Sequence, residues 1–124
     1  MARAKAPSSS EFQRKAALRT EALKELAQIG GEEKAESRIR LAELYLLELE
    51  KPEEALNLYA SVERDFPETP LLPKVLYALI HIRLEVLPDK TEAMKHYHRL
   101  VEQFPLSFYA EEARKHFASR LEER

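Results

Sequence analysis

Cysteine is absent from this chain of 124 residues, and glycine occurs only twice. Without a thiol, the protein has no disulfide, no thiolate zinc site and no cysteine nucleophile. The two glycines, Gly30 and Gly31, are adjacent, which is typical of a break between two helices. Because no predicted strand precedes them, they do not form a phosphate-binding loop. The absence of cysteine therefore excludes thiol chemistry, and the scarcity of glycine disfavours an enzyme with a phosphate-binding loop.

Long apolar runs and a strong excess of one charge are also missing. The longest apolar stretch, residues 75–86, is interrupted by His81, Arg83 and Glu85, whereas a membrane helix needs about 20 apolar residues. Residues 1–10 lack the apolar core of a signal peptide. The chain has 20 basic and 22 acidic residues, which disfavours a polycationic nucleic-acid binder. We expect no direct membrane insertion and no nucleic-acid partner.

The charges are nevertheless unevenly distributed. Residues 1–31 carry six Lys or Arg and three Asp or Glu, whereas residues 32–124 carry 14 and 19. The basic segment could lie on an acidic partner, on the acidic remainder of the chain, or simply in solvent. We expect residues 1–8 to be a disordered tail.

What the chain does contain is an internal repeat. Residues 53–67 read EEALNLYASVERDFP and residues 91–105 read TEAMKHYHRLVEQFP, at an offset of 38 residues. The same offset continues beyond the two segments and relates Leu72, Val75 and Leu79 to Ala110, Ala113 and Phe117. Repetition at this period is typical of a helical solenoid, in which each unit buries its apolar face against its neighbours. Such an architecture favours a protein that presents a surface to a partner.

Apolar periodicity and the positions of proline predict six helices, over residues 9–29, 32–50, 52–66, 70–87, 90–104 and 107–122. Asp89 and Ser107 are the expected N-caps of the last two helices. The fourth helix is apolar on nearly all sides, so it should be central, packed by the third, the fifth, and the second or first. No strand is predicted. Residues 9–124 therefore form a single all-α domain.

The third and fifth helices share one buried stripe. Its members lie at i, i+4, i+7 and i+11, which is one face of a helix: Ala55, Tyr59, Val62 and Phe66, and again Ala93, Tyr97, Leu100 and Phe104. The small alanine allows close approach of the neighbouring helix, and the aromatic residues fill the space further along.

These residues resemble the tetratricopeptide repeat, whose second helix carries a small residue, an aromatic residue four positions later, and a proline. The matching residues here are Ala55, Tyr59 and Pro67, and again Ala93, Tyr97 and Pro105. The usual second small residue is replaced by Val62 and Leu100, and the period is 38 rather than 34 residues. The resemblance implies a right-handed solenoid of about six antiparallel helices: two repeats, an N-terminal helix and a C-terminal capping helix.

Residues 104–113 are similar to a joint in bacterial repeats of periplasmic and outer-membrane assembly proteins. This resemblance implies a bacterial protein of the periplasm or cell envelope if a signal sequence has been removed, and a cytoplasmic protein otherwise.

The resemblance also implies a groove lined by the first helix of each repeat. The corresponding residues are Glu36, Ile39, Glu43 and Leu46 in the second helix, and Lys74, Tyr77, His81 and Leu84 in the fourth. The Lys/Asn/Arg clamp with which some relatives hold a terminal carboxylate is absent. A mixed groove of this kind suits an amphipathic helix or an extended peptide. The alternative is that the first helix, or another domain, covers these residues as core.

Candidate chemical sites are weak. His96 and His98 lie two positions apart, which on a helix places them on different faces, so one metal ion cannot easily take both. We expect both to be exposed, and we expect His81 to be partly buried or to face the groove. Paired glutamates such as Glu53 and Glu54 fall in first helical turns, where the helix dipole accounts for them. We therefore expect no catalysis, no metal and no cofactor.

The sequence thus predicts a non-catalytic protein-interaction scaffold that binds a peptide or helix of a partner protein. The alternative function is self-association, or packing against the remainder of its own polypeptide, which would make a homo-oligomer or an assembly domain.

Overall fold

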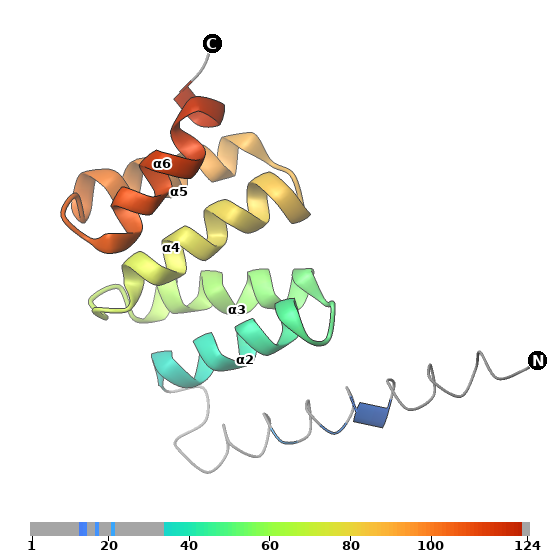
Figure 1. Cartoon of the computed structure of the whole chain (residues 1–124). Helices are drawn as coiled ribbons and strands as arrows, with labels where there is room; N and C mark the ends of the chain where they lie inside the picture. The colour runs from blue at the N-terminus through green and yellow to red at the C-terminus, as the bar shows by residue number, and fades with distance from the viewer. Residues whose placement is uncertain (1–12, 15–16, 18–20, 22–33, 123–124) are drawn as a thin grey trace, which may run out of the picture.

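The computed structural model describes residues 13–14, 17, 21 and 34–122. The helices along residues 34–122 are α2 (Ala35–Leu47), α3 (Pro52–Asp65), α4 (Leu72–His81), the π-helical turn η3 (Ile82–Val86), α5 (Lys90–Gln103) and α6 (Phe108–Glu122). These residues contain no strand. Figure 1 shows the helices stacked in chain order, with α2 at one end and α6 at the other. The predicted all-α helical repeat is confirmed.

The repeat extends to the hydrogen bonds at the helix ends. After α2, the amide of Leu49 donates to the carbonyl of Leu44 over 3.0 Å, and the amide of Lys51 donates to that of Tyr45 over 2.8 Å. At an offset of 38 residues, the amide of Leu87 donates to Ile82 over 2.7 Å, and that of Asp89 donates to Arg83 over 2.8 Å. The first helix of each repeat therefore ends in the same widened turn, and the hydrogen bonds of this turn satisfy the last carbonyl groups of the helix.

The shared stripe forms the core between the layers. Its alanine, tyrosine and third members are fully or almost fully buried in both repeats: Ala55, Tyr59 and Val62, and Ala93, Tyr97 and Leu100. The last members, Phe66 and Phe104, are half-buried against this core. Since an alanine has no side chain beyond Cβ, the next helix can approach closely at that point.

Helix α4 is the central element, as predicted. It packs against α3 and α5, and its third neighbouring helix is α6. Leu76 and Ile80 are fully buried, and η3 adds the buried Ile82. A helix that is apolar on nearly all sides requires several neighbours. The predicted contact with the second helix is present at the start of α4, where Lys74 pairs with Glu43 of α2, and α6 is a neighbour that the prediction did not include.

The predicted bounds differ from the structure mainly at the first helix of each repeat. The second helix was expected to run to residue 50, but α2 ends at Leu47 and Glu50 has a positive φ of 56°. Pro52 disfavours helical geometry at Lys51 and so separates this helix from α3, whereas the end at Leu47 coincides with the bond from the Leu49 amide to the Leu44 carbonyl. The fourth helix, expected over 70–87, begins at Leu72 and widens into η3. The predicted helix at 9–29 and the tail at 1–8 lie outside the described residues, apart from four positions.

Candidate partner-binding groove

A hollow of about 200 Å³ lies between the start of α4 and the facing side of α2. Its lining comprises Glu36, Ile39, Arg40 and Glu43 of α2, together with Leu71 and Lys74 at the start of α4. Ile39 is 4% exposed and Leu71 is half-buried, so these two side chains form an apolar floor. The other four side chains form a charged rim. An apolar floor with a few polar groups is the usual composition of a binding pocket.

The rim has both signs of charge and one ion pair across it. The Lys74 ammonium lies 3.0 Å from the Glu43 carboxylate, and both side chains are a little over one-third exposed. Burial, together with the charge of Glu43, raises the pKa of the neighbouring Tyr59 hydroxyl, which therefore stays protonated. An exposed pair of this kind contributes little to stability. Glu43 and Lys74 can therefore pair with groups of a ligand instead of with each other at little cost in stability.

The structure brings together four of the eight residues predicted for the groove: Glu36, Ile39, Glu43 and Lys74 line the hollow. Arg40 and Leu71 line it as well and were missed. Leu71 precedes the first turn of α4, outside the helical face from which the prediction was made. The 38-residue offset was the available signal, since it relates Leu71 to an aromatic residue, Tyr109, at the start of α6.

The other four predicted residues are not in the hollow. Tyr77 packs toward α6, with its ring centroid 5.2 Å from that of Phe117 and 5.8 Å from that of Tyr109. Burial, and then the charge of Glu112, raise the pKa of its hydroxyl. Leu46 and Leu84 are half-buried against the core.

His81 is exposed, so the expectation of a partly buried histidine was wrong, whereas the alternative of a groove-facing side chain stays open. Its neighbours Leu79, Ile80 and Ile82 take the buried positions of this turn. The apolar surroundings of His81 in the sequence therefore lie on the other sides of the helix.

His96 is also placed differently from the prediction. Its side chain is only 14% exposed and its Nδ1 lies 3.7 Å from a carboxylate oxygen of Glu63 in α3, whereas His98 is exposed as expected. Glu63 also forms an ion pair with Arg99. Burial lowers the pKa of His96 despite the opposing effect of Glu63 and Glu92. This histidine is therefore a neutral packing residue between α3 and α5 near pH 7.

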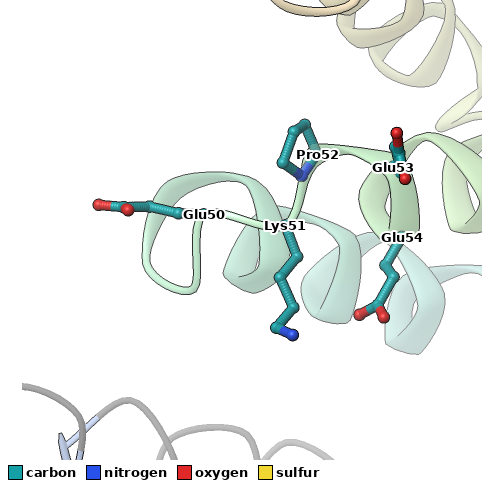
Figure 2. Close-up of a pocket in the computed structure, with 5 residues that line it drawn as sticks. All are labelled: Glu50, Lys51, Pro52, Glu53 and Glu54. Atoms are coloured by element: carbon teal, nitrogen blue, oxygen red, sulfur yellow. The ribbon is translucent and has the colours of Figure 1, made fainter.

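A second hollow, of about 310 Å³, lies at the turn between α2 and α3. Five consecutive residues line it: Glu50, Lys51, Pro52, Glu53 and Glu54. In Figure 2 their side chains point in different directions and do not converge on one point. Glu53 and Glu54 lie in the first turn of α3, where the helix dipole favours acidic side chains. This hollow therefore offers no assembled chemical site.

The described part of the chain has neither a metal-binding cluster nor a membrane-spanning helix. Among residues 34–122 and the four described positions before them, no group of three or more His, Asp or Glu could hold a metal ion. Over the same residues, no helix has both the length and the apolar character needed to cross a bilayer.

The family model described as "Tetratricopeptide repeat" matches residues 77–107. The matched segment covers the second half of α4, η3, α5 and the turn toward α6. No curated protein and no solved structure matches the chain significantly. The match supports a relation to the tetratricopeptide repeat family, and the described helices form an all-α repeat of that kind.

Proposed function

We propose that this protein is a non-catalytic scaffold that binds a peptide or helix of a partner protein. Repeats of this family generally mediate protein–protein interaction. The observation that carries the proposal is the hollow between α2 and α4, which joins an apolar floor to a rim of four charged side chains. Its lining comes from the first helix of each repeat, so partner residues could continue along the neighbouring layer.

The absence of catalysis is part of the proposal. Within residues 34–122, the groups with shifted pKa values are the buried or half-buried Tyr59, Tyr77, Tyr97 and His96, and the arginine-paired Asp65 and Glu85. Each shift has a packing or pairing cause, and these groups do not line the hollow. A catalytic site would instead gather such groups in one pocket.

Selection of peptides from a random display library on the full chain tests the scaffold function. Affinities of selected peptides would be measured by fluorescence polarisation for the wild type and the double variant Arg40→Ala/His81→Ala, whose side chains are exposed on α2 and α4. We expect binding to weaken at least tenfold. The matched control is Asn57→Ala/Glu102→Ala, two exposed positions on α3 and α5 that should leave affinity unchanged. Equal affinity in both variants would refute the groove.

Self-association is the second candidate function, and one observation favours it. Leu106, in the turn between α5 and α6, is 98% exposed, and Phe108, the first residue of α6, is 65% exposed. Exposed apolar side chains that occur close together in the sequence are a common feature of a contact surface. Light scattering over a concentration series should show a dimer that Leu106→Glu/Phe108→Glu dissolves. A wild-type monomer at every concentration contradicts this candidate.

A further inference from the structure

The hollow between α2 and α4 has an internal counterpart one repeat further along the chain. At an offset of 38 residues, its six lining residues, Glu36, Ile39, Arg40, Glu43, Leu71 and Lys74, correspond to Lys74, Tyr77, Ala78, His81, Tyr109 and Glu112. The two sites share backbone surroundings as well, because the turns before α4 and α6 carry equivalent hydrogen bonds, from Thr69 to Phe66 and from Ser107 to Phe104.

The counterpart site is filled by aromatic rings. Tyr77 and Tyr109 lie with their ring centroids 5.8 Å apart at an interplanar angle of 56°, and the ring centroid of Phe117 lies 5.2 Å from that of Tyr77. In the first site the corresponding side chains are Ile39, Leu71 and Leu79, which are all aliphatic. At the positions equivalent to Tyr77 and Tyr109, the first site has the smaller side chains Ile39 and Leu71, and an open volume of about 200 Å³ lies beside them.

We propose that this hollow binds a tyrosine side chain of the partner peptide, a step that rests on the scaffold function proposed above. A volume of about 200 Å³ is smaller than the pockets of about 300–1,000 Å³ that take drug-sized ligands, and it suits one side chain. The protein's own Tyr77–Tyr109 pair identifies an aromatic ring as what this backbone arrangement accommodates.

The rim selects tyrosine over phenylalanine. A phenol hydroxyl can donate to a carboxylate and accept from an ammonium group. Glu43 and Lys74 offer both groups 3.0 Å apart at the edge of the hollow, and Glu36 adds a second carboxylate. A ring with an apolar body and a polar tip therefore matches the apolar floor and the charged rim. Lys74 occupies the place that Glu112 has beside Tyr77 in the filled site.

The test uses the full chain, labelled with ¹⁵N, and the fragment N-acetyltyrosine amide, with the leucine and alanine analogues as comparisons. We expect saturable shifts at the amides of Ile39, Arg40, Leu71 and Lys74, with a dissociation constant on the order of a millimolar for a fragment of this size. The leucine fragment should bind at least threefold more weakly, and the alanine fragment should cause no saturable shift. Equal responses to all three fragments would overturn the proposal.

Two variants locate the binding. Leu71→Tyr places a ring where the second site has Tyr109, so it should fill the hollow and abolish binding of the tyrosine fragment. Leu106→Tyr is the matched control, because it adds the same ring in an exposed turn, and it should leave binding intact. Lys74→Ala, on a partly exposed side chain, should weaken binding of the tyrosine fragment at least threefold. Binding of N-acetylphenylalanine amide, a further comparison that lacks the hydroxyl, should be unchanged by the same substitution. Tyrosine binding unaffected by both Leu71→Tyr and Lys74→Ala would overturn the site.

The failures of the two proposals are distinguishable. Selected peptides that bind the groove without an aromatic residue would overturn the tyrosine preference and keep the scaffold function. Conversely, the tyrosine fragment could bind the hollow while Arg40→Ala/His81→Ala leaves peptide affinity unchanged. That result would support the tyrosine preference and show that the scaffold binds its peptides at another surface.

Discussion

Single residues set the spacing of the layers in this protein. Ala55 is completely buried in α3, where its missing side chain lets a neighbouring helix approach. We predict that Ala55→Leu lowers the free energy of unfolding by about 1–3 kcal/mol, because the added atoms must displace well-packed neighbours. Ala60→Leu, at an exposed position of the same helix, is the control and should change stability by less than about 0.5 kcal/mol. Urea denaturation measures both, and equal losses would contradict the packing argument.

His96 makes the stability of the protein depend on pH. Burial lowers its pKa in the folded state below the ordinary value of 6.5, and the charges of Arg83 and Arg99 add to the effect of burial. The unfolded chain therefore takes up a proton first, and stability should fall as the pH drops from about 6.5 toward the lowered pKa of the folded state.

Thermal unfolding between pH 8 and pH 5 measures this dependence. His96→Gln should flatten the slope in that window, whereas His98→Gln, at the exposed neighbouring histidine, should leave the slope as in the wild type. A slope that survives His96→Gln would assign the effect to another group.

These histidines also show where sequence reasoning stops at this scale. The spacing of His96 and His98 correctly placed them on different faces, but it could not say that Glu63 and Arg99 would cover one of those faces. Glu63 belongs to α3, 33 residues before His96 in the chain, and Arg99 lies three residues after His96 on α5. The prediction for His81 was wrong for a different reason. Its apolar neighbours in the sequence indicate that most sides of α4 are buried, but they do not indicate that the side carrying His81 is exposed.

At the scale of the elements, the helix starts were the most predictable feature. The Asp89 carboxylate accepts a hydrogen bond from the amide of Glu92 over 3.2 Å, and the Ser107 hydroxyl accepts from the amide of Ala110 over 3.0 Å, so both predicted caps are confirmed. The helix ends were less predictable, since the widened turns after α2 and α4 depend on long-range packing and on bonds such as that from Arg83 to the Leu87 carbonyl.

The repeat offers a matched pair of capping substitutions. Lys51, the residue before α3, corresponds to Asp89 at the 38-residue offset and makes no side-chain cap hydrogen bond. We predict that Asp89→Ala lowers the free energy of unfolding by about 1 kcal/mol and that Lys51→Asp raises it by about 0.5–1 kcal/mol. Chemical denaturation measures both. A loss of stability in Lys51→Asp would show that repulsion from Glu53 and Glu54 outweighs the new cap.

At the scale of the whole molecule, stability should decrease from the centre of the stack toward α6. Helix α4 has neighbours on three sides and several fully buried side chains. Helix α6 packs mainly against α4 and α5, reaches η3 through the Arg120–Glu85 ion pair, and exposes Glu111, Arg114 and Lys115. In a solenoid, each layer is stabilised by its own contacts and those with its neighbours. The amides of residues 76–80 should therefore exchange more slowly than those of residues 118–121. Hydrogen exchange followed by NMR measures this, and uniform protection would indicate a single cooperative unit.

The repeat could be predicted from the sequence because packing between layers constrains the second helix of each repeat in the same way. Ala55, Tyr59 and Val62 and their counterparts had to keep their size and spacing, so they remained visible in the sequence. The lining of the hollow could be predicted only in part. The hollow exists because Ile39 and Leu71 are smaller than their counterparts Tyr77 and Tyr109, and a repeat is recognised from shared residues, not from such differences.

The matching ends of α2 and of α4 with η3 also make the chain a source of building modules. Residues 52–89 begin with a second helix and end with the same amide-to-carbonyl bonds that precede residue 52, from Leu87 to Ile82 and from Asp89 to Arg83. Insertion of another copy of these 38 residues after position 89 would create one new junction, Asp89–Pro52, which is equivalent at the 38-residue offset to the existing Lys51–Pro52. Longer arrays could thus be assembled from one segment, and each added copy would extend the stack of helices by one layer.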